Sequence, residues 1–78
     1  MNPGMTPSKA ESTRQAIIAL LTLGPALTAD TLAERLDLSI LYVRPRVSEL
    51  VAQERIVASG DWGLNASGRM ANKWKAAL

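Results

Sequence analysis

Apolar residues recur at the three- and four-residue spacing of helices in three separate stretches between residues 8 and 53. In the first stretch the positions on one face are Ile17, Leu20, Leu21 and Gly24. Ser8 and Ser12 are each followed three residues later by Glu or Gln, so either serine can begin this helix with a capping box. Gly24 and Pro25 are expected to end it.

The second stretch predicts a short helix that begins after Thr28 and ends near Leu36 or Asp37. Thr28 is a favourable N-cap, and Asp30 falls in the first turn, where the helix dipole favours an anion. Leu27 and Leu32 have the spacing of a hydrophobic staple around this start. The positions expected to be buried are Leu32, Ala33 and Leu36.

The third stretch predicts a helix over residues 40–53, with Ser39 before it as a cap. Its apolar face consists of Val43, Val47, Leu50 and Val51. Pro45 lies inside this helix, where a proline costs about 3 kcal/mol because a backbone hydrogen bond is lost. If the regular helix begins only near Leu41 or Tyr42, Pro45 falls in or next to the first turn and costs little. If it begins at Ser39, Pro45 interrupts it.

The segment after residue 54 predicts a strand, followed by one of two structures. "RIVAS" is short and β-branched, which is typical of a strand. In one interpretation "SGDWG" is a tight turn and a final helix contains Met70, Trp74 and Leu78. In the other, the first strand continues to about Leu64, "NASG" is the turn, and "RMANKWKA" returns with Trp74 opposite Ser59. Helix propensity favours the first interpretation, and coverage of the core favours the second.

Composition limits the chain to one small domain and excludes several chemistries. The 78 residues contain no cysteine and no histidine, so disulfides, thiolate metal sites and the commonest general base are absent. We therefore expect no enzyme activity, no metal, no cofactor and no small-molecule ligand. No stretch is apolar enough to cross a membrane and no signal peptide is evident, which predicts a cytoplasmic protein. "MNPGMTP" predicts a flexible tail over residues 1–8, before a domain over residues 9–78.

Charge is distributed unevenly along the chain. Residues 1–38 contain three basic and four acidic side chains, whereas residues 39–78 contain six basic and three acidic ones. A basic half suits a polyanion such as nucleic acid, although ordinary surface charge explains it equally well.

The stretch "LAERLDLSILYVRPRVSELVAQERI" resembles the helix-turn-helix and following strand of bacterial winged-helix regulators. "VRPRVSEL" together with "SGRMANKW" is similar to a narrower group, the small winged-helix proteins of bacteriophages and prophages. The resemblance covers roughly Thr13 to Lys75 and implies an α+β winged helix-turn-helix fold, with three helices and a C-terminal hairpin wing. Asp37, Glu54 and Lys73 depart from it, because the family often has glycine at the first two positions and a β-branched residue at the third.

The resemblance implies double-stranded DNA as the partner, with helix 40–53 in the major groove and the wing on the backbone. The candidate DNA contacts are Ser39, Leu41, Tyr42, Arg44, Arg46, Ser48, Arg69, Lys73 and Lys75. Arg44 is the foremost candidate for reading a base, since arginine binds guanine O6 and N7 with two hydrogen bonds. Arg46 lies nearer the buried flank, where it can instead pair with Glu49 or brace the wing. Tyr42 can equally be a packing residue between helices.

Two functions remain open from the sequence. The first is sequence-specific DNA binding, as a homodimer, by a transcriptional regulator or a recombination or replication accessory factor of a phage or mobile element. The second is a phage protein-interaction module that uses the same scaffold, because Leu41, Tyr42 and Pro45 suit a protein partner as well as a groove.

Overall fold

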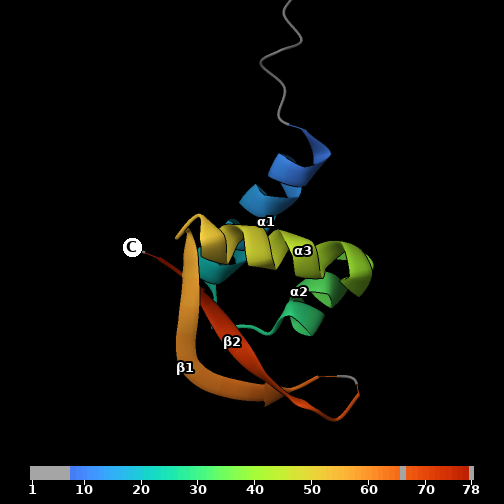
Figure 1. Ribbon diagram of the computed structural model, residues 1–78, viewed down its shortest axis with the longest axis vertical. Coiled ribbons are helices and arrows are strands. Elements are labelled where there is room, and N and C mark those ends of the chain that lie inside the picture. Colours follow the sequence, from blue (N-terminus) through green and yellow to red (C-terminus); the bar gives the residue numbers. More distant parts are fainter. Residues whose placement is uncertain (1–7, 66, 78) are drawn as a thin grey trace, which may run out of the picture.

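The computed structural model describes residues 8–65 and 67–77, which form three helices followed by a two-stranded antiparallel hairpin (Figure 1). The helices are α1 (Lys9–Leu23), α2 (Ala29–Leu36) and α3 (Ile40–Ala52). The strands are β1 (Ile56–Leu64) and β2 (Met70–Ala76). This is the winged-helix layout expected from the sequence, and the predicted tail falls almost entirely outside the described residues.

The three helices begin at predicted caps. Ser8 Oγ accepts a hydrogen bond from the Glu11 N–H at 3.1 Å, which selects Ser8 over Ser12 as the start of α1. Thr28 Oγ1 accepts from the Thr31 N–H at 3.2 Å and begins α2. Such caps satisfy backbone donors that have no partner inside the helix, so short polar side chains at these positions determine where each helix starts.

Pro45 lies in the second turn of α3, because the helix begins at Ile40 with Ser39 as its N-cap. The interpretation that places Pro45 in or next to the first turn is therefore wrong. Pro45 has no N–H to donate to the Leu41 carbonyl, and a proline also disfavours the helical conformation of the residue before it, Arg44. The helix nevertheless continues to Ala52, since burial of its apolar face outweighs this local cost.

Both helices of the helix-turn-helix end in a left-handed residue that is acidic. Asp37 has φ 55° and Glu54 has φ 59°. The Leu38 N–H donates to the Ala33 carbonyl at 2.9 Å, and the Arg55 N–H donates in the same way to the Leu50 carbonyl at 2.9 Å. These bonds form the Schellman motif, in which glycine is usual because other residues pay conformational energy there. The motif closes both helices without a glycine at either left-handed position.

Residues 67–77 form a turn and a strand, which excludes the terminal helix for this segment. Trp74 pairs with Ala58 rather than with Ser59, and the register of the ladder shifts between Ala58 and Trp62. Trp74 also forms an isolated antiparallel bridge with Leu27, whose N–H donates to the Trp74 carbonyl at 3.2 Å. The bridge ties the hairpin to the segment before α2, and the apolar pattern of the sequence did not indicate it.

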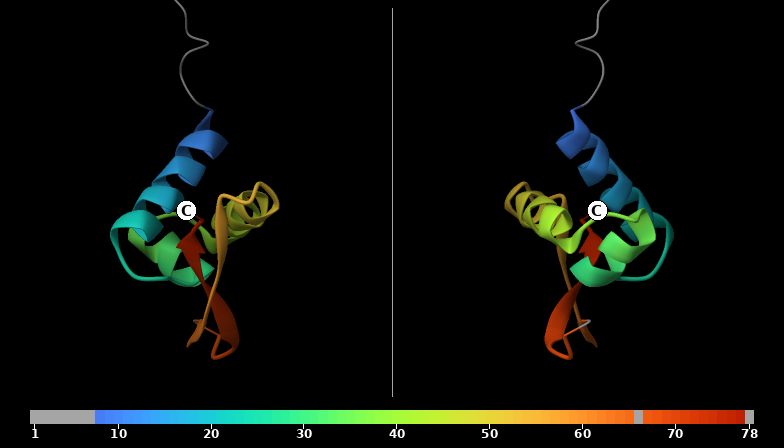
Figure 2. Two further views of the ribbon diagram at one scale, coloured as in Figure 1. Left: turned by 90° about the vertical axis from the view of Figure 1, so that its left-hand side faces the viewer. Right: turned by 90° about the vertical axis from the view of Figure 1, so that its right-hand side faces the viewer.

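The core lies where the three helices and the base of the hairpin meet. Its fully buried large side chains are Ile17, Leu32, Val43, Leu50 and Ile56, and Trp74 packs against them. Val51 was expected in this set but is 38% exposed, since it lies on the edge of the buried face. Beyond the base, the hairpin projects past the helical layer, as both side views show (Figure 2).

Candidate nucleic-acid interface

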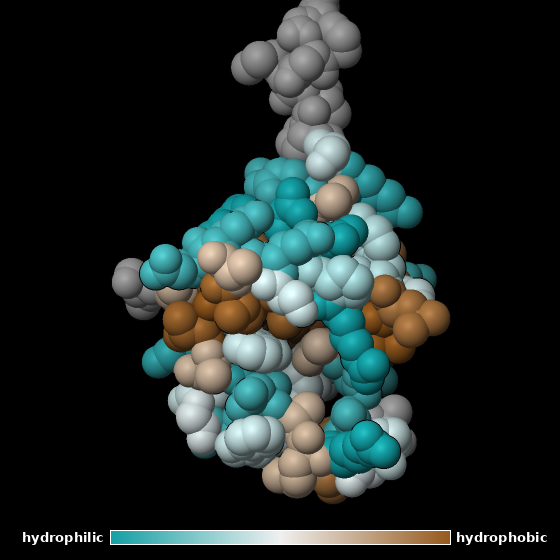
Figure 3. Space-filling model, in the orientation of Figure 1, coloured by the Kyte–Doolittle hydropathy of each residue, from teal (hydrophilic) through white to brown (hydrophobic). Residues whose placement is uncertain are grey.

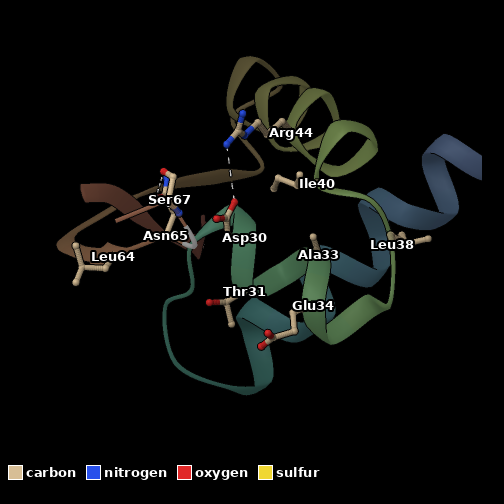
Figure 4. A pocket seen from close by; sticks show the side chains of 10 residues that line it. All are labelled: Asp30, Thr31, Ala33, Glu34, Leu38, Ile40, Arg44, Leu64, Asn65 and Ser67. Atoms are coloured by element: carbon tan, nitrogen blue, oxygen red, sulfur yellow. Dashed lines mark hydrogen bonds and ion pairs between the residues drawn. The ribbon is translucent and has the colours of Figure 1, made fainter. Parts of the chain in front are cut away.

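A hollow of about 570 Å³ separates α2 and the start of α3 from the tip of the hairpin (Figure 4). Ile40 and Arg44 line it from α3, and Asp30 and Glu34 from α2. The hairpin contributes Leu64, Asn65 and Ser67. The fold thus brings the helix with most of the predicted contacts and the wing to one face of the molecule.

Arg44 extends from α3 into this hollow and remains largely in solvent. Its side chain is 60% exposed, and its guanidinium lies 3.9 Å from the Asp30 carboxylate at the start of α2. An ion pair this long and this exposed contributes little free energy. Asp30 therefore lies beside the Arg44 guanidinium but leaves it accessible to a ligand. Asp30 was expected only as a favourable charge in the first turn of α2, and its position beside Arg44 depends on the packing of α2 against α3.

Two further predicted contacts share the exposed face of α3 with Arg44. Leu41 precedes Arg44 by one turn and is 78% exposed, and Ser48 follows it by one turn and is also exposed. Ser39 is exposed as well, but its Oγ accepts the Leu41 N–H at 3.1 Å and serves as the cap. Figure 3 shows two separate brown, hydrophobic areas on this face of the molecule, with mostly hydrophilic surface between them.

Tyr42 and Arg46 lie on the opposite flank of α3, against α1. The Arg46 guanidinium lies 4.9 Å from the centre of the Tyr42 ring, and the Lys9 ammonium lies 5.3 Å from it. Hydrogen bonding with Thr13 and the neighbouring Arg46 lower the pKa of the Tyr42 hydroxyl. Tyr42 is half-buried between helices, which agrees with the packing role that the sequence left open beside DNA contact.

Arg46 is held by Glu49 at 2.7 Å and its side chain is only 17% exposed. The pairing with Glu49 considered from the sequence is confirmed. Arg14 of α1 donates to the same Glu49 carboxylate at 2.5 Å, so the two helices share one acidic group. The Arg46 Nε is buried without a hydrogen-bond partner. The charge of Arg46 is thus largely neutralised within the fold, unlike that of Arg44.

A second carboxylate, Glu11, joins the ion pairs around Glu49 to Arg55, just after the end of α3. Arg55 donates to both Glu11 oxygens at 3.2 Å, and Arg14 Nε donates at 2.8 Å. These two guanidinium groups, Arg55 foremost, lower the pKa of Glu11 to about 2. The links of α1 to Glu49 and Arg55 were not predicted from the sequence, because these partners are separated by 35 and 44 residues. We call these five residues the charged cluster: Glu11, Arg14, Arg46, Glu49 and Arg55.

The wing tip is a turn organised by one side chain. Asn65 Oδ1 accepts hydrogen bonds from the Ser67 N–H at 3.2 Å, the Ser67 hydroxyl at 2.7 Å and the Arg69 N–H at 3.0 Å. Gly68 has φ 84°, a conformation that favours glycine. The predicted turn is thus present, and Arg69 is exposed directly after it.

The two lysines of the wing are not equivalent. Lys73 is half-buried, and its aliphatic stem lies over Gly63, where the γ-methyl of Thr28 also approaches. Lys75 is exposed but pairs with Val57 at the base of the hairpin, far along the strand from Arg69. The wing therefore offers its basic groups singly rather than as one cluster.

Fold and site together define a small winged-helix domain with an open helix-and-wing face. Comparisons with protein-family models, curated proteins and solved structures found no match for this chain. None of the helices in the described part of the chain is long and apolar enough to cross a membrane.

Proposed function

We propose that this chain binds double-stranded DNA, with the start of α3 in the major groove and the wing on the adjacent backbone. The observation that carries the proposal is that Arg44 and the wing tip line the same hollow. Arg44 is available to a base edge because its side chain is 60% exposed and its ion pair with Asp30 is 3.9 Å long. A guanidinium that binds guanine in two places contributes about 1–3 kcal/mol of discrimination.

The exposed face of α3 suits the major groove in its other side chains too. Leu41 would contact a thymine methyl, and Ser48 would donate to a base edge or a phosphate. Arg46 and Tyr42 are assigned a supporting role, since their polar groups are engaged against α1. One helix reads too few base pairs for a unique site, so we propose that two copies bind paired half-sites.

The resemblance to small phage and prophage winged-helix proteins supports a role as transcriptional regulator or as recombination or replication accessory factor. A cytoplasmic location follows from that role, because the DNA is there.

A protein-interaction module is the second candidate, and one observation favours it. Asp30 and Glu34 place two carboxylates in the hollow, and these would repel a phosphate that entered it. A partner with basic side chains would suit the same position.

Selection of bound sequences from a random duplex library tests the proposal. We expect enrichment of a motif containing guanine, and an affinity that falls with salt by about 0.9 log units per log unit for each phosphate contacted. Arg44→Ala should weaken binding to the selected motif. Arg35→Ala is its matched control, because Arg35 is an exposed arginine that lines a groove between α1 and α2 instead. No affinity for any duplex at low salt would exclude DNA binding and leave the protein-interaction module.

A further inference from the structure

The outer half of the hairpin exposes three large apolar side chains on one face. Trp62 is 55%, Leu64 is 68% and Met70 is 59% exposed. Leu64 and Met70 are directly opposite each other in the ladder, so their side chains lie side by side on the same face. Trp62 is two residues before Leu64 and shares that face. None of these three residues was among the candidate DNA contacts predicted from the sequence.

We infer that the Leu64–Met70 pair is an apolar wedge that enters the minor groove of the bound duplex and kinks it. The inference rests on the proposed DNA binding. Proteins that kink DNA from the minor groove combine a basic side chain with leucine, methionine or another apolar residue that separates neighbouring base pairs. Here Arg69 adjoins Met70 directly and is exposed at the tip.

The charge of the hairpin favours DNA over a second copy of this chain. The hairpin, residues 56–76, contains three basic residues and one acidic residue, Asp61. Two copies joined through this face would bring like charges together in an apolar contact, which is unfavourable. A polyanion has the complementary charge. Leu64 also lines the hollow that Arg44 enters, so a duplex held by α3 lies beside the wedge (Figure 4).

The turn at the tip of the hairpin is held in one conformation. A wedge must be rigid in this way if it is to separate stacked bases. Asn65 fixes the turn through the three hydrogen bonds to its side-chain oxygen. The Asn65 N–H also donates to the Arg69 carbonyl at 2.9 Å and closes the hairpin beside the Leu64–Met70 pair. The two side chains are thus presented from a closed ladder rather than from a loose loop.

The test uses the full chain and a duplex obtained from the library selection, with a donor and an acceptor dye at its ends. Binding of the unaltered protein should bring the ends closer by an amount that corresponds to a kink of about 20–90°. A 2-aminopurine placed at successive steps should brighten at one step, where stacking is lost. We expect that step to be TA or CA, because pyrimidine–purine steps unstack most easily.

The decisive variant is Leu64→Thr with Met70→Thr, which places β-branched strand formers at two exposed positions. It should bind the same duplex within about tenfold and leave it straight. Leu23→Thr is the matched control, since Leu23 is 88% exposed at the end of α1. This variant should bend the duplex like the unaltered protein.

Two results would overturn the wedge while DNA binding stands: a duplex that stays straight when the unaltered protein binds, or equal bending by the double variant. If no duplex is selected and the protein binds vesicles of anionic lipid through this hairpin, both the wedge and the proposed function are wrong. The thermal melting of each variant, followed by circular dichroism, checks that it is folded.

Discussion

The two flanks of α3 differ although their arginines belong to one short motif. Arg46, toward α1, is 17% exposed and paired with Glu49. Arg44, toward α2 and the wing, is 60% exposed and lies 3.9 Å from Asp30. One flank fastens the helix to the domain and the other is left open. Two residues of equal charge, separated by Pro45, thus have different tasks because the helix turns them toward different neighbours.

The largest change in stability is expected at the residue between the two flanks. Pro45→Ala restores an N–H that can donate to the Leu41 carbonyl, and it should raise the free energy of unfolding by up to about 3 kcal/mol. Urea denaturation followed by tryptophan fluorescence measures this.

The same variant examines whether Pro45 positions the open flank. If the proline holds the first turns of α3 for DNA contact, Pro45→Ala should lose affinity for the selected duplex despite its greater stability. Unchanged affinity and specificity would show that the proline has no part in presenting Arg44.

The comparison is tested most directly by exchanging each arginine for alanine. Arg44→Ala should reduce affinity for the selected duplex about 5- to 150-fold, the equivalent of one bidentate base contact, and should leave stability within about 0.5 kcal/mol. Arg46→Ala should lower the melting temperature, because Glu49 and Tyr42 each lose a cationic neighbour. Fluorescence anisotropy and calorimetry measure the two quantities. The opposite outcome, with Arg46→Ala losing specificity and Arg44→Ala losing stability, would reverse the assignment of the flanks.

A smaller stabilisation should come from the end of α3, away from both flanks. Glu54→Gly relieves a left-handed residue that is not glycine and should stabilise the protein by about 1 kcal/mol. Glu54→Ala is the control, since alanine retains the conformational cost. DNA affinity should be unchanged in both variants, which would show that stability and binding separate. A destabilised Glu54→Gly protein would mean that the glutamate contributes through its charge instead.

The pH dependence of folding should come from the charged cluster on the α1 side of α3. The pKa of Glu11 is about 2 in the folded chain and 4.5 ordinarily, and Arg46 and Arg14 lower the pKa of Glu49 too. Between the two pKa values of Glu11 the unfolded chain binds more protons than the folded chain. The free energy of unfolding is therefore at its full value above about pH 5 and falls toward pH 2. Denaturant midpoints at successive pH values measure this slope. Glu11→Gln should flatten it and Arg44→Ala should not; an unaltered slope in Glu11→Gln would exclude the charged cluster as its source.

The sequence by itself determined the three helices and the first strand, with Ser8 and Ser12 left open as the start of the first helix. Caps at Ser8, Thr28 and Ser39 and the spacing of apolar residues placed three helices to within a residue or two, since these signals act within one turn of chain. Local propensity also left a genuine ambiguity after residue 58, because "MANKWKAAL" favours a helix in isolation. The winged helix-turn-helix layout expected from the sequence favoured the strand.

Only the tertiary structure decided what each predicted side chain contacts. The strand over residues 70–76 exists because it pairs with β1 and joins Leu27 through Trp74, and those partners are remote in sequence. The division between Arg44 and Arg46 likewise depends on which helix packs on each side of α3. Glu11 and Arg55 meet across 44 residues, and no local pattern encodes such a contact. Spacing along the chain determines which residues share a face, but only packing determines what that face meets.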